Sequence, residues 1–232
     1  MTNKKYKHLF FDLDHTLWDF AANEKQTLSF LFEKYNLNKY FAGYDDFFAI
    51  YAPINSGLWL EYRTGIKKKQ DLKYFRFINT FQAVGFNDVA IAKQFADEWI
   101  AMNSQQTALT PYAREVLDYL FPKYEMYIIT NGFIETQYAK LERSKLRQYF
   151  KKVYISEEIG YQKPKREFFE YAIKSSNACK AESLVIGDNM EVDILGAIDF
   201  GLDQVYFNPD KIPHEEKIFK EISSLLELKE FL

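Results

Sequence analysis

Two carboxylates, Asp12 and Asp14, lie one residue apart where an apolar run near the start of the chain ends, and a hydroxyl follows at Thr16. Residues i and i+2 of a β-strand point to the same side, so both acids would face one site if the strand stayed regular; a bend in the backbone is the expected alternative. Carboxylates in apolar surroundings cost free energy unless a cation balances them. The pair therefore indicates a functional site that includes a cation.

Further polar residues follow later apolar runs of the chain. These runs are short and rich in β-branched or aromatic residues, which is typical of parallel strands buried on both faces. Ligands bind outside the carboxyl ends of such strands, so we expect the residues after each run to share one edge of a sheet. These residues are Thr130, Asn131 and Gly132 after the second run, Lys163 in the loop beyond the third, and Asp188 and Asp193 after the fourth.

This set of carboxylates, one lysine, a hydroxyl and a glycine-bearing loop suits phosphoryl transfer. Mg²⁺ takes a few carboxylates and keeps several waters, which leaves room for a phosphate oxygen, and Asp12 and Asp188 are the natural ligands. An aspartate can also attack phosphorus and form an aspartyl-phosphate, which divides hydrolysis into two easier steps. The reaction then needs a second acid to protonate the leaving oxygen and later to take a proton from water, and Asp14 is the candidate.

The transferred phosphoryl group also needs positive charge and hydrogen-bond donors. Lys163, together with the cation, would neutralise charge on the equatorial oxygens. The hydroxyl of Thr130 and the amides of Asn131 and Gly132 would donate hydrogen bonds to them. We therefore expect these four residues and Asp12 to bind the phosphate.

The elements that must position these residues alternate between strands and helices. We expect strands at 8–13, 126–129, 153–155, 184–186 and 205–207, and helices at 133–147, 167–175 and 192–200, the last of them ended by Gly201. Such alternation predicts an α/β fold built on a doubly wound, Rossmann-like parallel sheet.

Residues 19–107 interrupt this order. The stretch contains no convincing strand, and its apolar residues recur at helical spacing, as in Leu28, Leu31, Phe32 and Tyr35. Glycines and a proline divide it into several helices. We therefore expect residues 1–18 and 108–232 to form the core around the sheet, and residues 19–107 to form an all-helical insert.

The polar segments resemble the four motifs of the haloacid dehalogenase superfamily, most of whose members are phosphatases. The matching segments are Asp12-Leu13-Asp14-His15-Thr16, then Thr130, then Lys163, then Gly187-Asp188 through Asp193. The resemblance implies that Asp12 is the nucleophile, that Asp14 is the acid and base, and that Mg²⁺ is held by Asp12, the Asp14 carbonyl and Asp188. It also implies that Asp193 assists through a metal-bound water or by positioning Lys163, and that the helical insert is a C1 cap.

Three residues of the first motif narrow the choice within the superfamily. Dehalogenases and phosphonatases of this superfamily lack the second aspartate, so the resemblance, together with Asp14, favours phosphate-ester chemistry. His15 and Thr16 stand where phosphoglucomutase-like members usually carry glycine and valine, which favours hydrolysis over intramolecular transfer. His15 itself has no assigned role.

A closer resemblance is to bacterial pyrimidine 5′-nucleotidases that remove non-standard nucleotides. It rests on residues 129–133, 141–143 and 155–160 with the following Lys163-Pro164, and on Asn55, Leu58-Trp59, Tyr62, Gly65 and Arg76 in the insert. The resemblance implies a nucleoside 5′-monophosphate substrate such as UMP, dUMP or dTMP. Because ligand pockets tend to be lined by aromatic side chains, Trp59 and Tyr62, beside Asn55 and Arg63, are the candidates to contact the base or sugar.

Two other functions remain open at this point. The core motifs do not read the leaving group, so the substrate could be a small sugar phosphate or another phosphorylated metabolite. A binding module for phosphorylated ligands without catalysis is the alternative of a different class. The intact acid pair and Lys163 weigh against it, because a binder needs no general acid.

Composition excludes several classes of protein. The 232 residues include 30 basic and 33 acidic side chains, a formal net charge of −3, which argues against binding a nucleic acid polymer. The single cysteine, Cys179, excludes an intramolecular disulfide. No run approaches the roughly 18 to 20 apolar residues of a membrane span, and no signal peptide is recognisable. We expect a cytoplasmic enzyme that does not associate with membranes.

Overall fold

A computed structural model of the chain describes residues 6–232, and the chain divides into two compact units. Met1–Ala21 and Gln106–Leu232 form one unit, which we call the sheet unit, and Ala22–Gln105 form the second, the helical unit. Residues 1–5, which belong to the core expected from the sequence, lie outside the described part of the chain.

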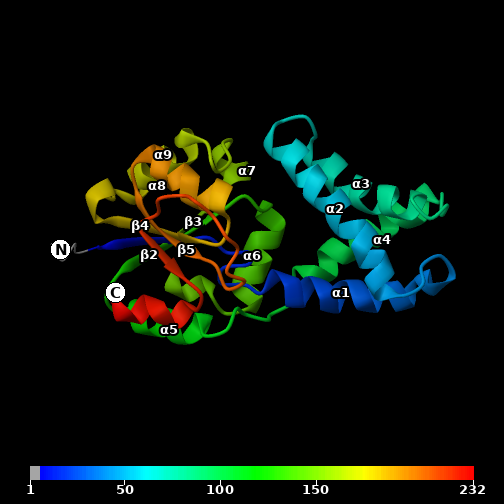
Figure 1. The fold of residues 1–232 in the computed structure, drawn as a ribbon, viewed down its shortest axis with the longest axis horizontal. Helices are drawn as coiled ribbons and strands as arrows, with labels where there is room; N and C mark the ends of the chain where they lie inside the picture. Colours follow the sequence, from blue (N-terminus) through cyan, green and yellow to red (C-terminus); the bar gives the residue numbers. More distant parts are fainter. Residues whose placement is uncertain (1–5) are drawn as a thin grey trace. The chain divides into compact units, whose positions relative to one another are not determined.

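The sheet unit is built on a single six-stranded parallel sheet, seen at the left of Figure 1. The strands run in the order β3-β2-β1-β4-β5-β6, and Phe10 of β1 lies opposite Tyr127 of β2 and Val185 of β4. Ligands of such sheets bind where the sequence order reverses, which here is at the carboxyl end of β1. The strands are β1 (His8–Phe11), β2 (Glu125–Thr130), β3 (Lys152–Ile155), β4 (Ser183–Gly187), β5 (Asp203–Phe207) and β6 (Lys220–Ile222).

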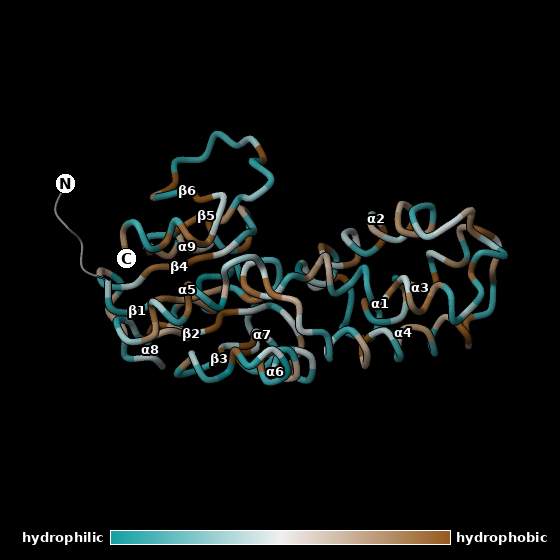
Figure 2. Tube along the Cα trace, turned by 90° about the horizontal axis from the view of Figure 1, so that it is seen from below, coloured by the Kyte–Doolittle hydropathy of each residue, from teal (hydrophilic) through white to brown (hydrophobic). Residues whose placement is uncertain are grey.

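Helices cover both faces of this sheet. On one face, Leu9 and Phe11 pack into a core with α5 (Ala113–Leu120), and on the other, Phe10 packs with α8 (Arg166–Ser176) and α9 (Gly196–Phe200). Brown, apolar stretches therefore follow the strands in Figure 2. Burial on both faces explains why the strands read as continuous apolar runs, and the predicted doubly wound α/β fold is confirmed.

Two expected helices differ from the structure at their ends. The helix expected over 133–147 is α6, Ile134–Arg143, because Lys145 takes a left-handed conformation (φ 54°) and the amide of Leu146 bonds back to the Leu141 carbonyl. The helix expected over 192–200 begins with a π-helical turn at Met190–Leu195, capped by Asn189, and continues as α9. Strand β6 and helix α5 had no counterpart among the expected elements.

The remaining ordered segments of the sheet unit are short. They are α7 (Ser156–Ile159) and the 3₁₀ turns Arg147–Tyr149, Lys180–Glu182 and Leu225–Glu230.

The helical unit contains no strand among its residues, all of which are described. Tyr51, Phe77 and Phe95 form its aromatic core, with ring centroids 5.3 Å apart between Tyr51 and Phe77 and 4.8 Å apart between Phe77 and Phe95. Most of the chain's many aromatic residues in this stretch therefore serve packing. Its elements are α1 (Phe20–Lys34), a 3₁₀ turn (Leu37–Lys39), α2 (Tyr44–Arg63), α3 (Lys69–Gln82) and α4 (Val89–Asn103).

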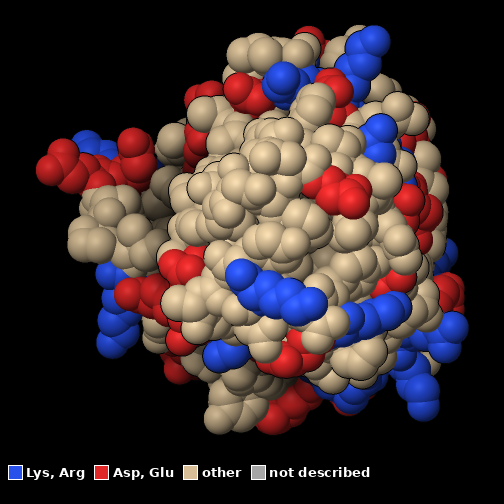
Figure 3. All heavy atoms as spheres, turned by 90° about the vertical axis from the view of Figure 1, so that its right-hand side faces the viewer, with Lys and Arg blue, Asp and Glu red and all other residues tan. Residues whose placement is uncertain are grey.

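On the face seen in Figure 3, basic and acidic side chains are interspersed around an uncharged centre, and no basic stripe runs across it. None of the described helices is both long enough and apolar enough to cross a membrane.

Candidate active site

The backbone bends directly after β1. Of the two alternatives considered for the first motif, a regular strand or a bend, the structure has the bend. The amides of Leu17 and Trp18 both bond to the Leu13 carbonyl, and His15 adopts a left-handed conformation with φ 66°. The amide of Asp12 bonds to the Ile186 carbonyl at 2.9 Å, which holds the start of this turn against β4. Asp12 and Asp14 consequently enter two different environments.

Asp12 faces a buried lysine. The ammonium of Lys163, only 1% exposed, lies 2.6 Å from Oδ1 of Asp12 and 2.5 Å from Oδ1 of Asp193, and it also donates to the Ile129 carbonyl at 2.9 Å. Burial alone would lower the pKa of Lys163, but the two carboxylates outweigh it and raise this pKa above its usual value. Lys163 is therefore a permanent cation fixed by three acceptors.

Asp193 reaches this lysine through a close approach to β4. Its second oxygen, Oδ2, accepts a hydrogen bond from the amide of Asn189 at 3.2 Å, so both carboxylate oxygens are engaged by the protein. A Cβ atom on Gly187 would lie 2.5 Å from that Oδ2, so a glycine is required there. The contacts of Asp193 are those of a residue that holds Lys163 in place.

Asp188 completes a cluster of acids at the same edge of the sheet. One oxygen from each of Asp12, Asp188 and Asp193 lies within 4.8 Å of the other two, and the hydroxyl of Thr16 donates to Asp188 Oδ1 at 2.8 Å. Burial, and then the charge of Asp193, raise the pKa of Asp188 to about 7. Burial also raises the pKa of Asp12 well above its usual range, against the opposing effect of Lys163.

This donor set fits a hard divalent cation. Buried carboxylates with raised pKa values are short of positive charge, and Lys163 supplies only one. Mg²⁺ and Ca²⁺ prefer carboxylate oxygens of this kind. Because Asp193 is engaged by Lys163 and Asn189, Asp12 and Asp188 are the side chains with oxygens to offer a metal.

The residues after β2 form a compact loop at the same edge. The Thr130 hydroxyl accepts from the amide of Gly132 at 3.1 Å and donates to Gln137 Oε1 at 3.4 Å. The side chain of Asn131 bonds twice to the backbone of Lys163, at 2.8 and 2.9 Å. The structure thus brings the second and third motifs together, with the side-chain amide of Asn131 holding the loop that carries Lys163.

Asp14 points to α6, where two residues that were not predicted from the sequence donate hydrogen bonds to it. Lys140 Nζ lies 2.6 Å from Asp14 Oδ1, and Gln137 Nε2 donates to Asp14 Oδ2 at 3.1 Å. Lys140 and Gln137 are 4% and 1% exposed. The available signal was their i, i+3 spacing, which places both on one helix face beside the apolar Leu141.

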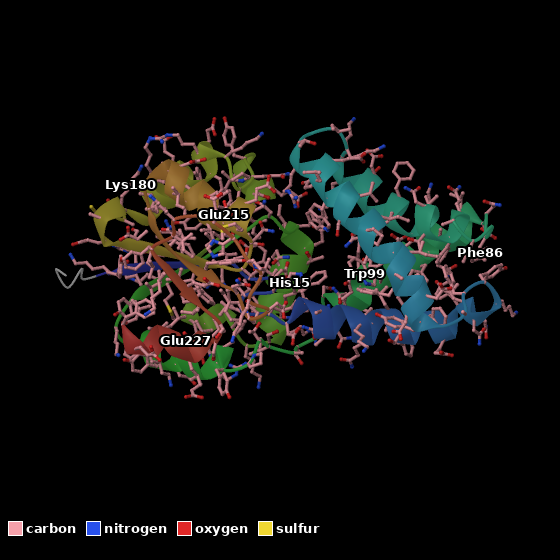
Figure 4. All side chains as sticks on the ribbon, in the orientation of Figure 1. His15, Phe86, Trp99, Lys180, Glu215 and Glu227 are labelled. Atoms are coloured by element: carbon pink, nitrogen blue, oxygen red, sulfur yellow. The ribbon has the colours of Figure 1, made fainter. Side chains whose placement is uncertain are left out.

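His15 directly follows Asp14 in the bend after β1. Its ring packs against Phe20 with centroids 4.8 Å apart, and Figure 4 shows it on the sheet unit. Together with Asp188 and Tyr112, His15 lines a cavity of about 450 Å³ in this unit, and the described residues that line it include no lysine or arginine.

Arg76 is the most enclosed of the candidates in the helical unit. This side chain is 2% exposed, its Nε donates to the Leu72 carbonyl at 2.8 Å, and its guanidinium carbon lies 4.9 Å from the Trp99 ring centroid and 6.0 Å from that of Trp59. Figure 4 shows Trp99 inside this unit. The buried Oδ1 of Asn55 has no hydrogen-bond partner among the described residues.

Two further candidates lie near the end of α2. Tyr62 packs edge-on against Trp59 with ring centroids 5.9 Å apart, and both, like Arg63, are half-buried. Trp59 and Tyr62 therefore keep surface with which to contact a ligand, whereas Arg76 is enclosed by its own unit.

Several known proteins are similar to this chain over most of its length. The sequence model of the family described as haloacid dehalogenase-like hydrolase matches residues 6–201. The pyrimidine 5′-nucleotidase YjjG of Escherichia coli K12 is 33% identical over 231 residues, 98% of either chain. The pyrimidine 5′-nucleotidase PynA of Streptococcus pneumoniae R6 is 34% identical over 207 residues, 88% of this chain and 84% of that protein.

A solved structure is also similar over almost the whole chain. The crystal structure of the putative HAD-hydrolase YfnB from Bacillus subtilis, bound to magnesium, superposes with a TM-score of 0.88 at 32% identity and covers 98% of each chain.

Proposed function

Because this chain belongs to the haloacid dehalogenase-like hydrolase family, we propose that it is a Mg²⁺-dependent phosphomonoester hydrolase that acts through an aspartyl-phosphate. The observation that carries the proposal is the contact of Asp12 with Lys163 at 2.6 Å inside a cluster that also contains Asp188 and Asp193. It puts a carboxylate nucleophile next to fixed positive charge at the carboxyl end of a central strand.

The residues of this chain divide the reaction among themselves. A carboxylate oxygen of Asp12 attacks phosphorus, and Lys163 balances charge on the phosphoryl oxygens, as Thr130 and the amides of Asn131 and Gly132 do by hydrogen bonding. Asp14 protonates the leaving oxygen and later takes a proton from the water that hydrolyses the intermediate. Asp193 holds Lys163 in place through their 2.5 Å contact.

The metal belongs to the same cluster. Asp12, Asp188 and the carbonyl of Asp14 would hold Mg²⁺, which when bound supplies further positive charge for the phosphate oxygens. A magnesium-bound structure that is similar over 98% of the chain supports this assignment.

We further propose nucleoside 5′-monophosphates as the substrate class. Two relatives of 33% and 34% identity carry the name pyrimidine 5′-nucleotidase, and the helical unit presents half-buried aromatic residues, Trp59 and Tyr62, suited to a base. Residues 19–107 would act as the cap that reads the leaving group, with Asn55, Arg63 and Arg76 as further specificity residues.

The experiment is a panel of phosphorylated metabolites assayed for released phosphate with and without EDTA. UMP, dUMP and dTMP should be turned over fastest, and EDTA should abolish the turnover. If sugar phosphates clearly outperform nucleotides, the substrate class is wrong, although the phosphatase assignment stands.

A variant tests the phosphatase assignment itself. Asp12→Asn removes the nucleophile and should lower turnover of p-nitrophenyl phosphate by roughly 10³-fold or more, with a normal thermal unfolding transition. Full activity of Asp12→Asn would exclude the aspartyl-phosphate. Binding of UMP by a wild-type protein that hydrolyses none of the esters would point to a binding module.

A further inference from the structure

Each aspartate of the first motif has its own buried lysine. Lys163 contacts Asp12 at 2.6 Å, and Lys140, from a different element, contacts Asp14 at the same distance. The first pairing follows from the family motifs quoted above, whereas Lys140 belongs to none of them. A second buried cation beside the proposed acid and base needs its own explanation, because burying an ammonium is costly.

The surroundings of Lys140 fix its position closely. Its Nζ lies 4.3 Å from the Trp18 ring centroid and 5.1 Å from that of Phe20, so aromatic faces enclose the ammonium from the side of the Asp14 turn. Trp18 is itself fully buried, and its Nε1 donates to the Gln106 carbonyl at 3.2 Å. Lys140 therefore has little room to move away from Asp14.

Gln137 links Asp14 to the phosphate-binding loop. Its Nε2 donates to Asp14 Oδ2 at 3.1 Å, and its Oε1 accepts from the hydroxyl of Thr130 at 3.4 Å. A Cβ atom on Gly132 would lie 2.0 Å from this Nε2, so the glycine after Thr130 makes room for the glutamine. Both oxygens of Asp14 are thus held, one by a charged donor and one by a neutral donor.

We propose that Lys140 and Gln137 are positioning residues that orient the carboxyl group of Asp14 for proton transfer to the leaving group. Lys140 anchors Oδ1, because a charged donor at 2.6 Å holds more strongly than a neutral one at 3.1 Å. Oδ2, which among the described residues is held by Gln137 alone, is the oxygen that exchanges the proton. The inference rests on the proposed function.

In the hydrolysis of a phosphomonoester, Asp14 gives up one proton and later regains one. As the bond between phosphorus and the ester oxygen breaks, its electron pair stays on that oxygen, which takes the proton from Oδ2 of Asp14. Asp14 is left as a carboxylate, whose charge the ammonium of Lys140 balances. The water that attacks the aspartyl-phosphate later gives a proton to Asp14. The bond between phosphorus and the Asp12 oxygen breaks, inorganic phosphate leaves, and the enzyme returns to its starting state.

The test compares leaving groups that need a proton with one that does not. An alkyl alkoxide, such as the 5′-oxygen of a nucleoside, is a poor leaving group, whereas p-nitrophenolate leaves without protonation. The value of kcat/KM reports the steps up to release of the alcohol, so it isolates this half of the reaction. Lys140→Met should lower kcat/KM for UMP roughly 10²-fold, whereas kcat/KM for p-nitrophenyl phosphate should fall far less.

Conservative and matched variants complete the design. Lys140→Arg, which keeps a charged donor, should recover part of the loss on UMP, and Lys174→Met, at a lysine that is 74% exposed, should change neither substrate. An equal loss on both substrates, or no loss on either, would overturn the inference. If wild type does not hydrolyse UMP, ribose 5-phosphate serves as the alkyl ester.

A second variant keeps the test open if Lys140→Met fails to fold. Gln137→Met removes the contact to Oδ2 without burying an unpaired charge, and it should give the same selective loss to a smaller extent. A uniform loss in Gln137→Met would contradict the inference. Wild-type turnover of neither ester would instead refute the proposed function, so the two failures are distinguishable.

Discussion

Lys163 and Asp193 form a 2.5 Å ion pair in which the side chains are only 1% and 2% exposed. The pair comes from a loop after β3 and a π-helical turn after β4, so it ties together two of the segments that carry the site. The same ammonium contacts Asp12 at 2.6 Å. One lysine therefore links these segments and supplies positive charge to the proposed phosphate site.

Removing this lysine should cost stability as well as activity. Lys163→Met leaves Asp12 and Asp193 buried without their cation, and breaking a buried ion pair costs about 3–5 kcal/mol. Urea unfolding should show this loss. The matched control is Lys174→Met, which breaks an exposed i, i+4 pair with Glu170 and should cost at most about 0.5 kcal/mol. Equal stabilities of the two variants would mean that the Lys163 pair contributes nothing.

Magnesium should stabilise the protein more at higher pH. The pKa of Asp188 rises from 3.8 to about 7 on folding, so without metal the folded state holds an extra proton and loses stability as pH rises through that window. A bound cation favours the ionised carboxylate and removes this penalty. The gain in Tm on adding MgCl₂ should therefore be larger at about pH 8 than at about pH 5.

A variant separates this effect from general ionic stabilisation. Asp188→Asn keeps the shape of the side chain but removes its charge, so it should lose most of the magnesium-dependent gain at the higher pH. A gain that is the same at both pH values, or unchanged in Asp188→Asn, contradicts the metal site.

The fold and the candidate site residues at the strand ends could be predicted because both follow from local sequence patterns. Phe10 and Phe11 face opposite sides of a sheet that is covered on both, so the strand reads as an apolar run. Asp12, Thr130 and Asp188 each follow such a run, and parallel strands bring their carboxyl ends to one edge. The topology of the sheet was therefore sufficient to predict that these three residues lie close together.

The Lys140–Asp14 contact and strand β6 could not be predicted, because no local sequence pattern marks them. The contact of Lys140 with Asp14 spans 126 positions, and Lys140 lies in the last turn of a helix, where lysine is an ordinary surface residue. The three-residue strand β6 begins with Lys220 and Glu221 and lies at the edge of the sheet, so neither length nor pattern marks it. Burial of a polar residue by distant elements is a tertiary property that spacing along the chain does not encode.

Trp59 should matter for nucleotides and not for small aryl phosphates. Stacking of a base on an aromatic side chain is worth about 1–3 kcal/mol, so Trp59→Ala should lower kcat/KM for UMP roughly tenfold or more. Turnover of p-nitrophenyl phosphate should stay within about twofold. Phe30→Ala, at a 54% exposed aromatic residue of α1, is the control and should change neither. If Trp59→Ala changes kcat/KM equally for both substrates, Trp59 does not contact the base.

Two glycines should respond in opposite directions to the same substitution. A Cβ on Gly187 would lie 2.5 Å from Asp193 Oδ2 and 2.6 Å from its Cγ. Asp193 cannot retreat without leaving Lys163, so Gly187→Ala should cost about 1–3 kcal/mol and reduce phosphatase activity. Gly57, exposed within α2, has no atom within 4 Å of such a Cβ, so Gly57→Ala should stabilise the chain by up to about 1 kcal/mol. Urea unfolding measures both. A Gly187→Ala variant as stable and active as wild type would show that the Lys163–Asp193 pair can shift freely. It would contradict the inference that Lys163 has a fixed position in the proposed phosphate site.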